Sequence, residues 1–188
     1  KKLNFEMPFT TFFSKIIVQY IFLYKKLFTL LLTQKTHKKT RFFIKKKSCI
    51  FDKNYNIMEK TLDDKKYSFF WGGFFSNWYP STFNINGITY NCGEQYMMAQ
   101  KAKIFGDIES EKLIMITQNP KEQQAIGRRI KNFDSKKWDE VKYELVKKGL
   151  REKYNQNIVL KNYLLERKDC LIVEASPYDK IWGIGFDE

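Results

Sequence analysis

The spacing of apolar residues predicts an amphipathic helix in the stretch NCGEQYMMAQKAKIFGD, residues 91–107. The helix is expected to end near the glycine at position 106, which is a typical stop signal. Six side chains recur at three- and four-residue intervals, which places them on one helical face: Glu94, Met97, Met98, Lys101, Ile104 and Phe105. Two of these are charged, although charged groups are rarely buried unless they are paired or functional.

Further helices are predicted after this one, and local signals mark several of their ends. Residues 108–117 form the first. Asn119 and Pro120 then provide the N-cap and first position of a helix that is expected to reach about Ile130. A last helix is expected over about residues 157–167.

A longer helix is predicted between these segments. Asp134 is its expected N-cap, and the helical pattern continues to about Tyr154. On this helix one apolar face is shared by Trp138, Val141 and Leu145.

Short strands are predicted on both sides of the helices. Residues 67–71 form a strand that leads into the glycine-rich aromatic segment WGGFFSNWYPS. In FNINGITY, residues 83–90, Asn86-Gly87 separates two β-prone runs, which is the strongest short-range signal for a hairpin. The apolar run CLIVEA, residues 170–175, predicts a buried strand.

Residues 1–57 have a different composition from the rest, and the domain boundary is therefore expected at Met58. We interpret them as a basic, apolar N-terminal extension outside the fold, with organelle targeting as the alternative. The apolar run Ile16–Tyr24 has nine residues, whereas a membrane-spanning helix needs about 20. A membrane partner is therefore not expected, and the main domain is assigned to residues 58–188 and to the cytoplasm.

The net charge of +13 is concentrated in this extension. Residues 1–57 contain 13 Lys and Arg against two acidic residues, whereas residues 58–188 contain 21 against 19. A basic protein suggests a nucleic-acid partner, but a nearly neutral domain does not. We therefore expect a small-molecule substrate and no stable nucleic-acid partner; the oligomeric state is left open.

Cysteine and histidine usage excludes several kinds of site. The three cysteines, Cys49, Cys92 and Cys170, lie far apart, which argues for a reducing compartment and against disulfides or structural zinc. The single histidine, His37, lies in the extension. Residues 58–188 therefore cannot form a Ser-His-Asp or Cys-His arrangement or a histidine-ligated metal site, and no metal or other cofactor is expected.

Two segments could contribute to a ligand site near the first helix. Glu94 and Lys101 are seven residues apart and point the same way, about 10.5 Å apart along the axis, so they could flank a small ligand. Alternatively, Glu94 interacts with the helix dipole and Lys101 extends to solvent. The segment WGGFFSNWYP, with Ser76 and Asn77, suits a base or ribose ligand; an aromatic corner of the core is the alternative.

Two further segments are weaker candidates. Arg128, in Gly-Arg-Arg, could bind phosphate through its guanidinium group, or it could lie at a solvated helix end. Near the C-terminus, Glu174, Asp179 and Trp182 could close a nucleoside pocket. The Gly-Ile-Gly that follows is not a dinucleotide fingerprint, because no strand–GxGxxG–helix unit surrounds it.

The order of these segments resembles the NADAR family, also called YbiA-like, from about residue 67 to residue 185. The resemblance is carried by SNWYPSTF, GEQYMMAQKAKIFGD, GRRI, K-Y-x-Q-N and L-x-V-E-A-S-P-x-D-x-x-WGIG. It implies a compact, single α+β domain that is mainly α-helical, with a short hairpin or small sheet near its start. It also implies cleavage of N-glycosidic bonds. Relatives continue past WGIG to a final helix, so the C-terminal segment is expected to be short here.

The resemblance also implies roles for individual residues. Glu94 would be a catalytic or ribose-orienting carboxylate, and Lys101 would attack the anomeric carbon to form a Schiff base. The expected activity is an N-glycosidase acting on ribosylamino-pyrimidine 5′-phosphates of riboflavin biosynthesis. The alternatives are a hydrolase of ADP-ribosylated guanine and a non-catalytic module that binds ADP-ribose or a nucleotide. The residues expected to contact substrate are Ser76, Asn77, Arg128, Trp138, Glu174, Asp179 and Trp182.

Overall fold

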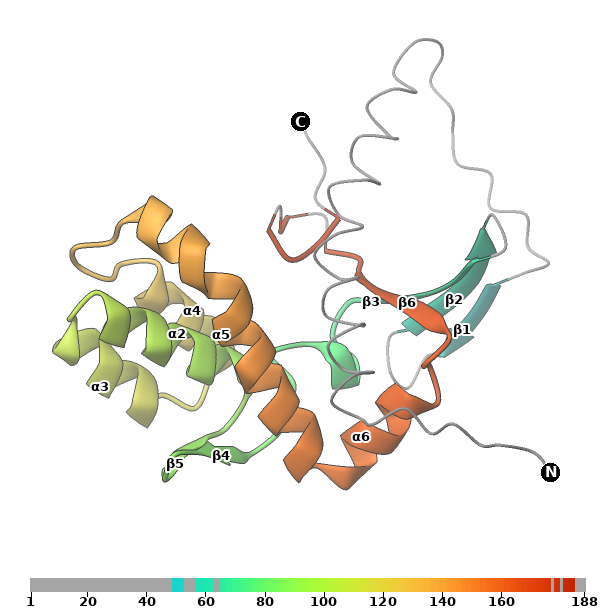
Figure 1. The fold of residues 1–188 in the computed structure, drawn as a ribbon, viewed down its shortest axis with the longest axis horizontal. Helices are drawn as coiled ribbons and strands as arrows, with labels where there is room; N and C mark the ends of the chain where they lie inside the picture. Colours follow the sequence, from blue (N-terminus) through green and yellow to red (C-terminus); the bar gives the residue numbers. More distant parts are fainter. Residues whose placement is uncertain (1–48, 53–56, 63–64, 177, 180, 185–188) are drawn as a thin grey trace, which may run out of the picture. The chain divides into compact units, whose positions relative to one another are not determined.

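The fold was analysed in a computed structural model, which describes residues 49–52, 57–62, 65–176, 178–179 and 181–184 (Figure 1). The chain divides into two units. One, the helical unit, is Phe74–Leu165; the other, the sheet unit, contains the described residues of Lys1–Gly73 and Glu166–Glu188. The prediction of an α+β protein that is mainly α-helical is confirmed.

The sheet unit contains a four-stranded sheet in the order β1-β2-β3-β6. The first three strands, β1 (Cys49–Asp52), β2 (Ile57–Leu62) and β3 (Lys65–Phe70), pair antiparallel, whereas β6 (Cys170–Glu174) runs parallel to β3. The boundary expected at Met58 falls inside β2, and β1 comes from before it. Residues 1–48 of the expected extension lie outside the described residues.

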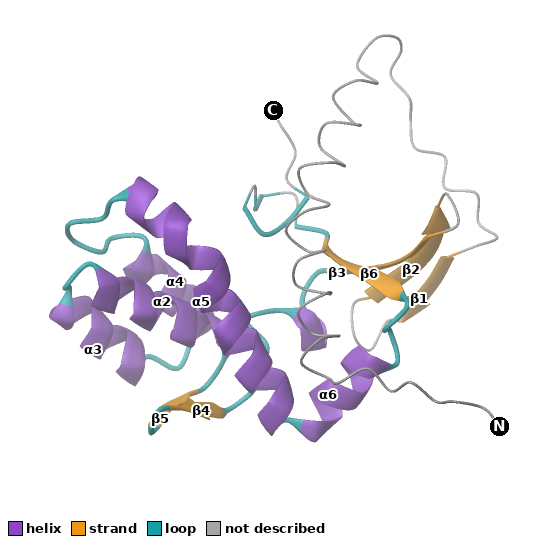
Figure 2. Cartoon of the chain, viewed as in Figure 1, coloured by secondary structure: helices purple, strands orange, loops and turns teal. Residues whose placement is uncertain are grey.

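The helical unit is built around α2 (Gly93–Ile104), which contacts α3, α4 and α5 (Figure 2). Every residue of α2 from Gly93 to Ala99 is buried, as is Ala102. The remaining helices are α3 (Ile108–Ile116), α4 (Pro120–Gly127), α5 (Ser135–Gln156) and α6 (Ile158–Leu165). The helices predicted from the sequence are thus all present, and Gly106, with a φ of 70°, follows α2 as expected.

The predicted hairpin is confirmed. It consists of β4 (Phe83–Ile85) and β5 (Ile88–Tyr90), with Asn86 and Gly87 between them. Both turn residues have positive φ, 54° and 83°, which is what a two-residue type I′ turn requires. The hairpin places the buried rings of Phe83 and Tyr90 with their centroids 5.8 Å apart.

The predicted end of α4 was wrong by three residues. The helix ends at Gly127 rather than at Ile130. The Gly127 carbonyl accepts from Lys101 Nζ, and the Lys131 amide, which a longer helix would bond to that carbonyl, donates to Asp107 instead. Gly127 also lies directly against α2. A Cβ at this position would lie 2.0 Å from Sδ of Met98. After this close contact the chain leaves the helix, and Ile130 is buried beyond it.

The predicted apolar face of α5 agrees with the buried face at Trp138 and differs from it at the other two positions. Val141 is 36% exposed, and Leu145 is only half-buried. The buried positions recur at the same helical spacing but are rotated by one residue; they are Trp138, Lys142, Val146, Gly149 and Lys153. Two lysines interrupt this face in the sequence, so a reading based on apolar residue types misplaced it.

Two buried glutamines close the C-terminal end of α3. Gln95 Oε1 accepts from the Asn91 amide at 2.7 Å, and Gln123 Nε2 donates to Asn91 Oδ1 at 3.2 Å. Gln123 also accepts from the Cys92 thiol. Because a buried amide is costly unless it is hydrogen-bonded, these side chains determine how α3 ends. Nε2 of Gln95 donates to the carbonyls of Ile114, Met115 and Thr117.

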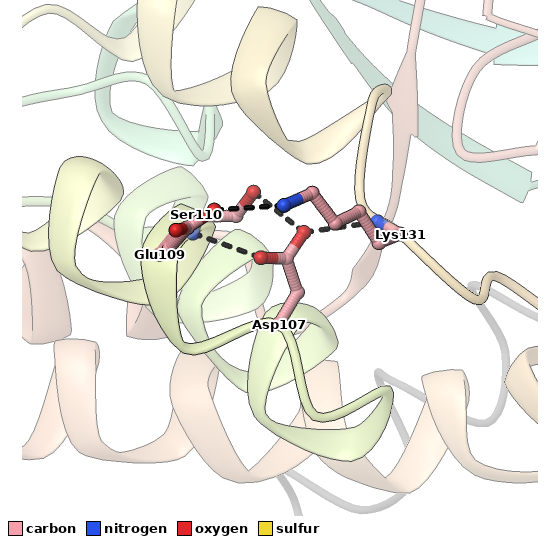
Figure 3. Close-up of polar contacts among 4 residues, drawn as sticks. All are labelled: Asp107, Glu109, Ser110 and Lys131. Atoms are coloured by element: carbon pink, nitrogen blue, oxygen red, sulfur yellow. Dashed lines mark hydrogen bonds and ion pairs between the residues drawn. The ribbon is translucent and has the colours of Figure 1, made fainter.

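Asp107 caps the other end of α3 (Figure 3). Its carboxylate accepts from the Lys131 amide at 2.9 Å, and from the amide and hydroxyl of Ser110 at 3.1 and 2.7 Å. These hydrogen bonds, that of Lys131 first, hold the pKa of Asp107 below its ordinary value. The adjacent ion pair, between the Lys131 ammonium and Glu109, is largely exposed and therefore contributes little to stability.

We expect Asp107→Ala to lower the thermal unfolding temperature at pH 7. The capping carboxylate stabilises the fold above its unfolded pKa of about 3.9, and this contribution is lost as pH falls through the lower folded pKa. The difference between the wild type and the variant should therefore shrink in acid, as measured by circular dichroism during heating. Glu109→Ala is the control and should change the temperature little. If the unfolding temperatures of the wild type and Asp107→Ala differed equally at neutral and strongly acidic pH, the stabilisation by Asp107 would not depend on its charge, and the prediction would be wrong.

Candidate functional site

The Lys101 side chain is half-buried on α2. The prediction of one buried face on this helix was wrong, because every residue from Gly93 to Ala99 is buried. Its Nζ donates to the Gly127 carbonyl at 2.8 Å and lies 4.2 Å from the centroid of the Phe133 ring. The Trp138 ring is 5.8 Å away. The alternative in which Lys101 extends freely into solvent is therefore not what the structure shows.

The pKa of Lys101 is lowered from its ordinary value. The main cause is burial, which disfavours the ammonium form. Glu94 opposes this shift and Arg128 adds to it, so both charged side chains act on the lysine electrostatically. A lowered pKa increases the fraction of neutral amine, which is the nucleophilic form.

Glu94 lies in the first turn of α2 and is 2% exposed. Its backbone N–H donates to the Asn77 carbonyl at 2.9 Å. The Asn77 side chain also packs against this turn, since a Cβ on Gly93 would lie 2.7 Å from Asn77 Oδ1. Only glycine at position 93 leaves room for this arrangement, which brings Asn77 next to Glu94.

The remaining predicted site residues of the helical unit differ in their burial and in their hydrogen bonds. Trp138 is buried on α5, whereas Arg128 is exposed just after α4. The Ser76 hydroxyl accepts from the Trp78 amide at 3.1 Å, which is a turn-forming hydrogen bond. The structure thus groups Lys101 with Trp138, and Glu94 with Asn77, along one helix.

Glu174, Asp179 and Trp182 belong to the sheet unit. Asp179 Oδ1 accepts from the amides of Ile181 and Trp182, both at 2.8 Å. The Ile184 amide donates to the Glu174 carbonyl at 3.0 Å, so the segment after β6 returns to the end of that strand. Burial, with a smaller contribution from Asp179, raises the pKa of Glu174 to about 7.

Sequence reasoning missed two neighbours of this site. The Phe133 ring forms a cation–π contact with the Lys101 ammonium. Lys153 is completely buried, and its Nζ donates to the Ser76 carbonyl. Two signals for Lys153 were present: it lies at helical spacing from Val146 and Gly149, and it is the lysine of the K-Y-x-Q-N segment, to which no role was assigned. Phe133 lies between α4 and α5, where periodicity gives no information about contacts.

Comparison with known proteins connects this arrangement to a family. The NADAR domain family matches residues 69–188. An N-glycosidase of Acanthamoeba polyphaga mimivirus is 42% identical over 137 residues, which cover 66% of this chain and 81% of that protein. The N-glycosidase YbiA of Shigella flexneri is 31% identical over 113 residues, covering 60% of this chain and 69% of that protein.

Two further relatives extend the comparison. A riboflavin biosynthesis protein of Vibrio vulnificus is 27% identical over 144 residues, covering 74% of this chain and 37% of that protein. The NMR structure of the E. coli protein YbiA matches with a TM-score of 0.57 and 28% identity, covering 66% of this chain and 75% of that chain.

The extent of the family match defines the class of this protein: the chain belongs to the NADAR domain family. The resemblance inferred from the segments between residues 67 and 185 is therefore confirmed. In the part of the chain that the structure describes, no helix has the length and apolar character needed to span a bilayer.

We expect Glu174→Gln to stabilise the protein at pH 8 and to have little effect at pH 4. Because the folded pKa, about 7, exceeds the unfolded value of about 4.3, stability is lost as pH rises between them. The glutamine removes this loss, so its unfolding temperature should exceed that of the wild type only at the higher pH. The exposed Glu166 provides the control, Glu166→Gln. A pH-independent effect of Glu174→Gln would show that the glutamate is not buried as a protonated acid.

Proposed function

We propose that this protein is an N-glycosidase in which Lys101 is the nucleophile and Glu94 supports the reacting sugar. The observation that carries the proposal is the half-buried Lys101 amine, which is within electrostatic reach of the buried Glu94 carboxylate. Membership of the NADAR family and the N-glycosidase names of several relatives support a hydrolase acting on N-glycosyl bonds.

The chemistry follows from these two groups. As the N-glycosidic bond breaks, positive charge develops on the ribose, and a carboxylate such as Glu94 stabilises it. The neutral amine of Lys101 forms a bond to the anomeric carbon while the base leaves with the bonding electron pair and takes up a proton. The glycosyl-lysine adduct then loses a proton from nitrogen, and the nitrogen lone pair expels the ring oxygen, which takes up a proton; the ribose ring opens and a protonated imine is formed. Water adds to the imine carbon, and cleavage of the carbon–nitrogen bond releases the sugar as its aldehyde and restores the lysine. Desolvation of Lys101 favours this route because it increases the neutral fraction of the amine.

The proposed substrate is a ribosylamino-pyrimidine 5′-phosphate. The relative named as a riboflavin biosynthesis protein supports this choice. Arg128 is exposed close enough to Lys101 to lower its pKa, which suits a guanidinium that binds the phosphate of a sugar attached at that amine. Hydrolysis of ADP-ribosylated guanine on nucleic acid ranks second, because residues 58–188 carry little net charge.

We expect Lys101→Met to abolish base release from the ribosylamino-pyrimidine phosphate and to remove adduct trapping. Borohydride added during turnover should reduce the imine and leave the sugar on the wild-type protein, where mass spectrometry of peptides would find it at Lys101. Lys103→Met is the matched control, because Lys103 is exposed on the same helix. The mechanism would be wrong if Lys101→Met still formed a trapped adduct.

We expect Arg128→Gln to shift the rising limb of the kcat–pH profile to higher pH. The guanidinium lowers the pKa of Lys101, so its removal should raise that pKa and require a higher pH for the same amount of neutral amine. Measurements at saturating substrate separate this effect from weaker phosphate binding, which would appear in KM. The exposed Arg129 provides the control, Arg129→Gln. A shift toward lower pH would contradict the electrostatic assignment.

A further inference from the structure

Lys153 occupies an unusual position in the last turn of α5. Its side chain is 0% exposed, and its Nζ donates to the carbonyls of Ser76 at 2.8 Å and Phe74 at 3.1 Å. Among the residues that the structure describes, no carboxylate forms an ion pair with it. The two backbone carbonyls are therefore its main polar partners.

Burying a lysine without an acidic partner costs stability, so the residue is not explained by packing alone. Burial lowers the pKa of Lys153 to about 7. Lys153 can donate both hydrogen bonds whether its side chain is a charged ammonium or a neutral amine, because a neutral amine retains two N–H donors. Lys142, on the same buried face of α5, is instead paired with Asp139 at 2.6 Å. What distinguishes Lys153 is the segment to which it is bonded.

That segment leads directly to the proposed site. The residue after Ser76 is Asn77, whose carbonyl accepts from the Glu94 amide and whose side chain packs against Gly93. Ser76 also accepts from the Tyr79 amide at 3.2 Å. The short segment is therefore held on one side by the end of α5 and on the other by the first turn of α2.

We propose that Lys153 is a positioning residue for the N-glycosidase site. By bonding to the carbonyls of Phe74 and Ser76, it holds Asn77 against the first turn of α2, where Glu94 lies. Lys153 does not touch the substrate; it acts through Asn77 and the backbone of Glu94. The catalytic part of this inference depends on the proposed function, whereas the positioning of the segment does not.

Amide hydrogen exchange of the full chain tests the positioning itself. In Lys153→Met, the amides of Glu94 and Tyr79 should exchange at least about tenfold faster than in the wild type. The Gln123 amide, which donates to the carbonyl of Asn119, the N-cap of α4, should be unchanged. Lys142→Met removes another buried lysine, 8% exposed, from the same face and should leave all three amides unchanged. Unaltered exchange at Glu94 and Tyr79 in Lys153→Met would overturn the proposal.

A double-mutant cycle with Asn77→Ala tests the catalytic part. Misplacing Asn77 and Glu94 should lower kcat/KM by about 10- to 100-fold, with Lys142→Met close to the wild type. Asn77→Ala keeps the carbonyl that accepts from the Glu94 amide and removes the side chain that packs against Gly93. Because the route through this side chain is already lost in Asn77→Ala, the double variant Lys153→Met/Asn77→Ala should be little worse than the poorer single variant. Losses that multiply, or an equal loss in Lys142→Met, would contradict this route.

Two other outcomes, a variant that does not fold and a wild type without activity, also distinguish the positioning role from its alternatives. If Lys153→Met does not fold, Lys153→Gln keeps two N–H donors on a side chain one atom shorter and should give a smaller rise in exchange at the same two amides. Failure of both variants to fold would show that Lys153 supports the whole unit, and the positioning role would be wrong. If the wild type releases no base, the proposed function fails, while the exchange result still decides whether Lys153 holds the segment.

Discussion

The hydrogen bonds between the end of α5 and the segment before α2 are the interaction on which the proposed site depends. Lys153 and Tyr154 both donate to the Phe74 carbonyl, and Asn157 donates to that of Thr82. Gln156 exchanges two hydrogen bonds with the backbone of Asn84. These residues are more than 70 positions apart in the sequence. Most of this segment has no regular ladder of its own, so side chains from α5 supply partners for its backbone groups.

Three lysines show how one residue type can serve three purposes in the same unit. Lys142 is paired with an acid, and Lys153 is bonded to two carbonyls. Lys101 has one carbonyl partner, aromatic rings beside its ammonium, and only a half-buried side chain. Of the three, Lys101 therefore combines desolvation with a partly exposed side chain, which is the combination that a nucleophilic amine needs.

Much of the secondary structure could be predicted from the sequence because its causes are local. Asn119 and Asp134 each cap a helix with their own side chain, and Asn86-Gly87 adopts the positive φ values of its turn. The face of α2 that carries Glu94 and Lys101 was also visible as a spacing. The buried face of α5 was misplaced, because lysines with buried stems resemble surface residues until their partners are known.

The sequence by itself therefore determined the helices, the hairpin and the family, since capping, periodicity and ordered motifs are properties of neighbouring residues. The tertiary structure decided which groups surround the Lys101 amine and which segment Lys153 holds. Gly127 and Phe133 reach Lys101 from 26 and 32 positions away, and Phe74 lies 79 positions before Lys153. Contacts at such separations depend on how the helices pack, and no local pattern of residue types encodes them.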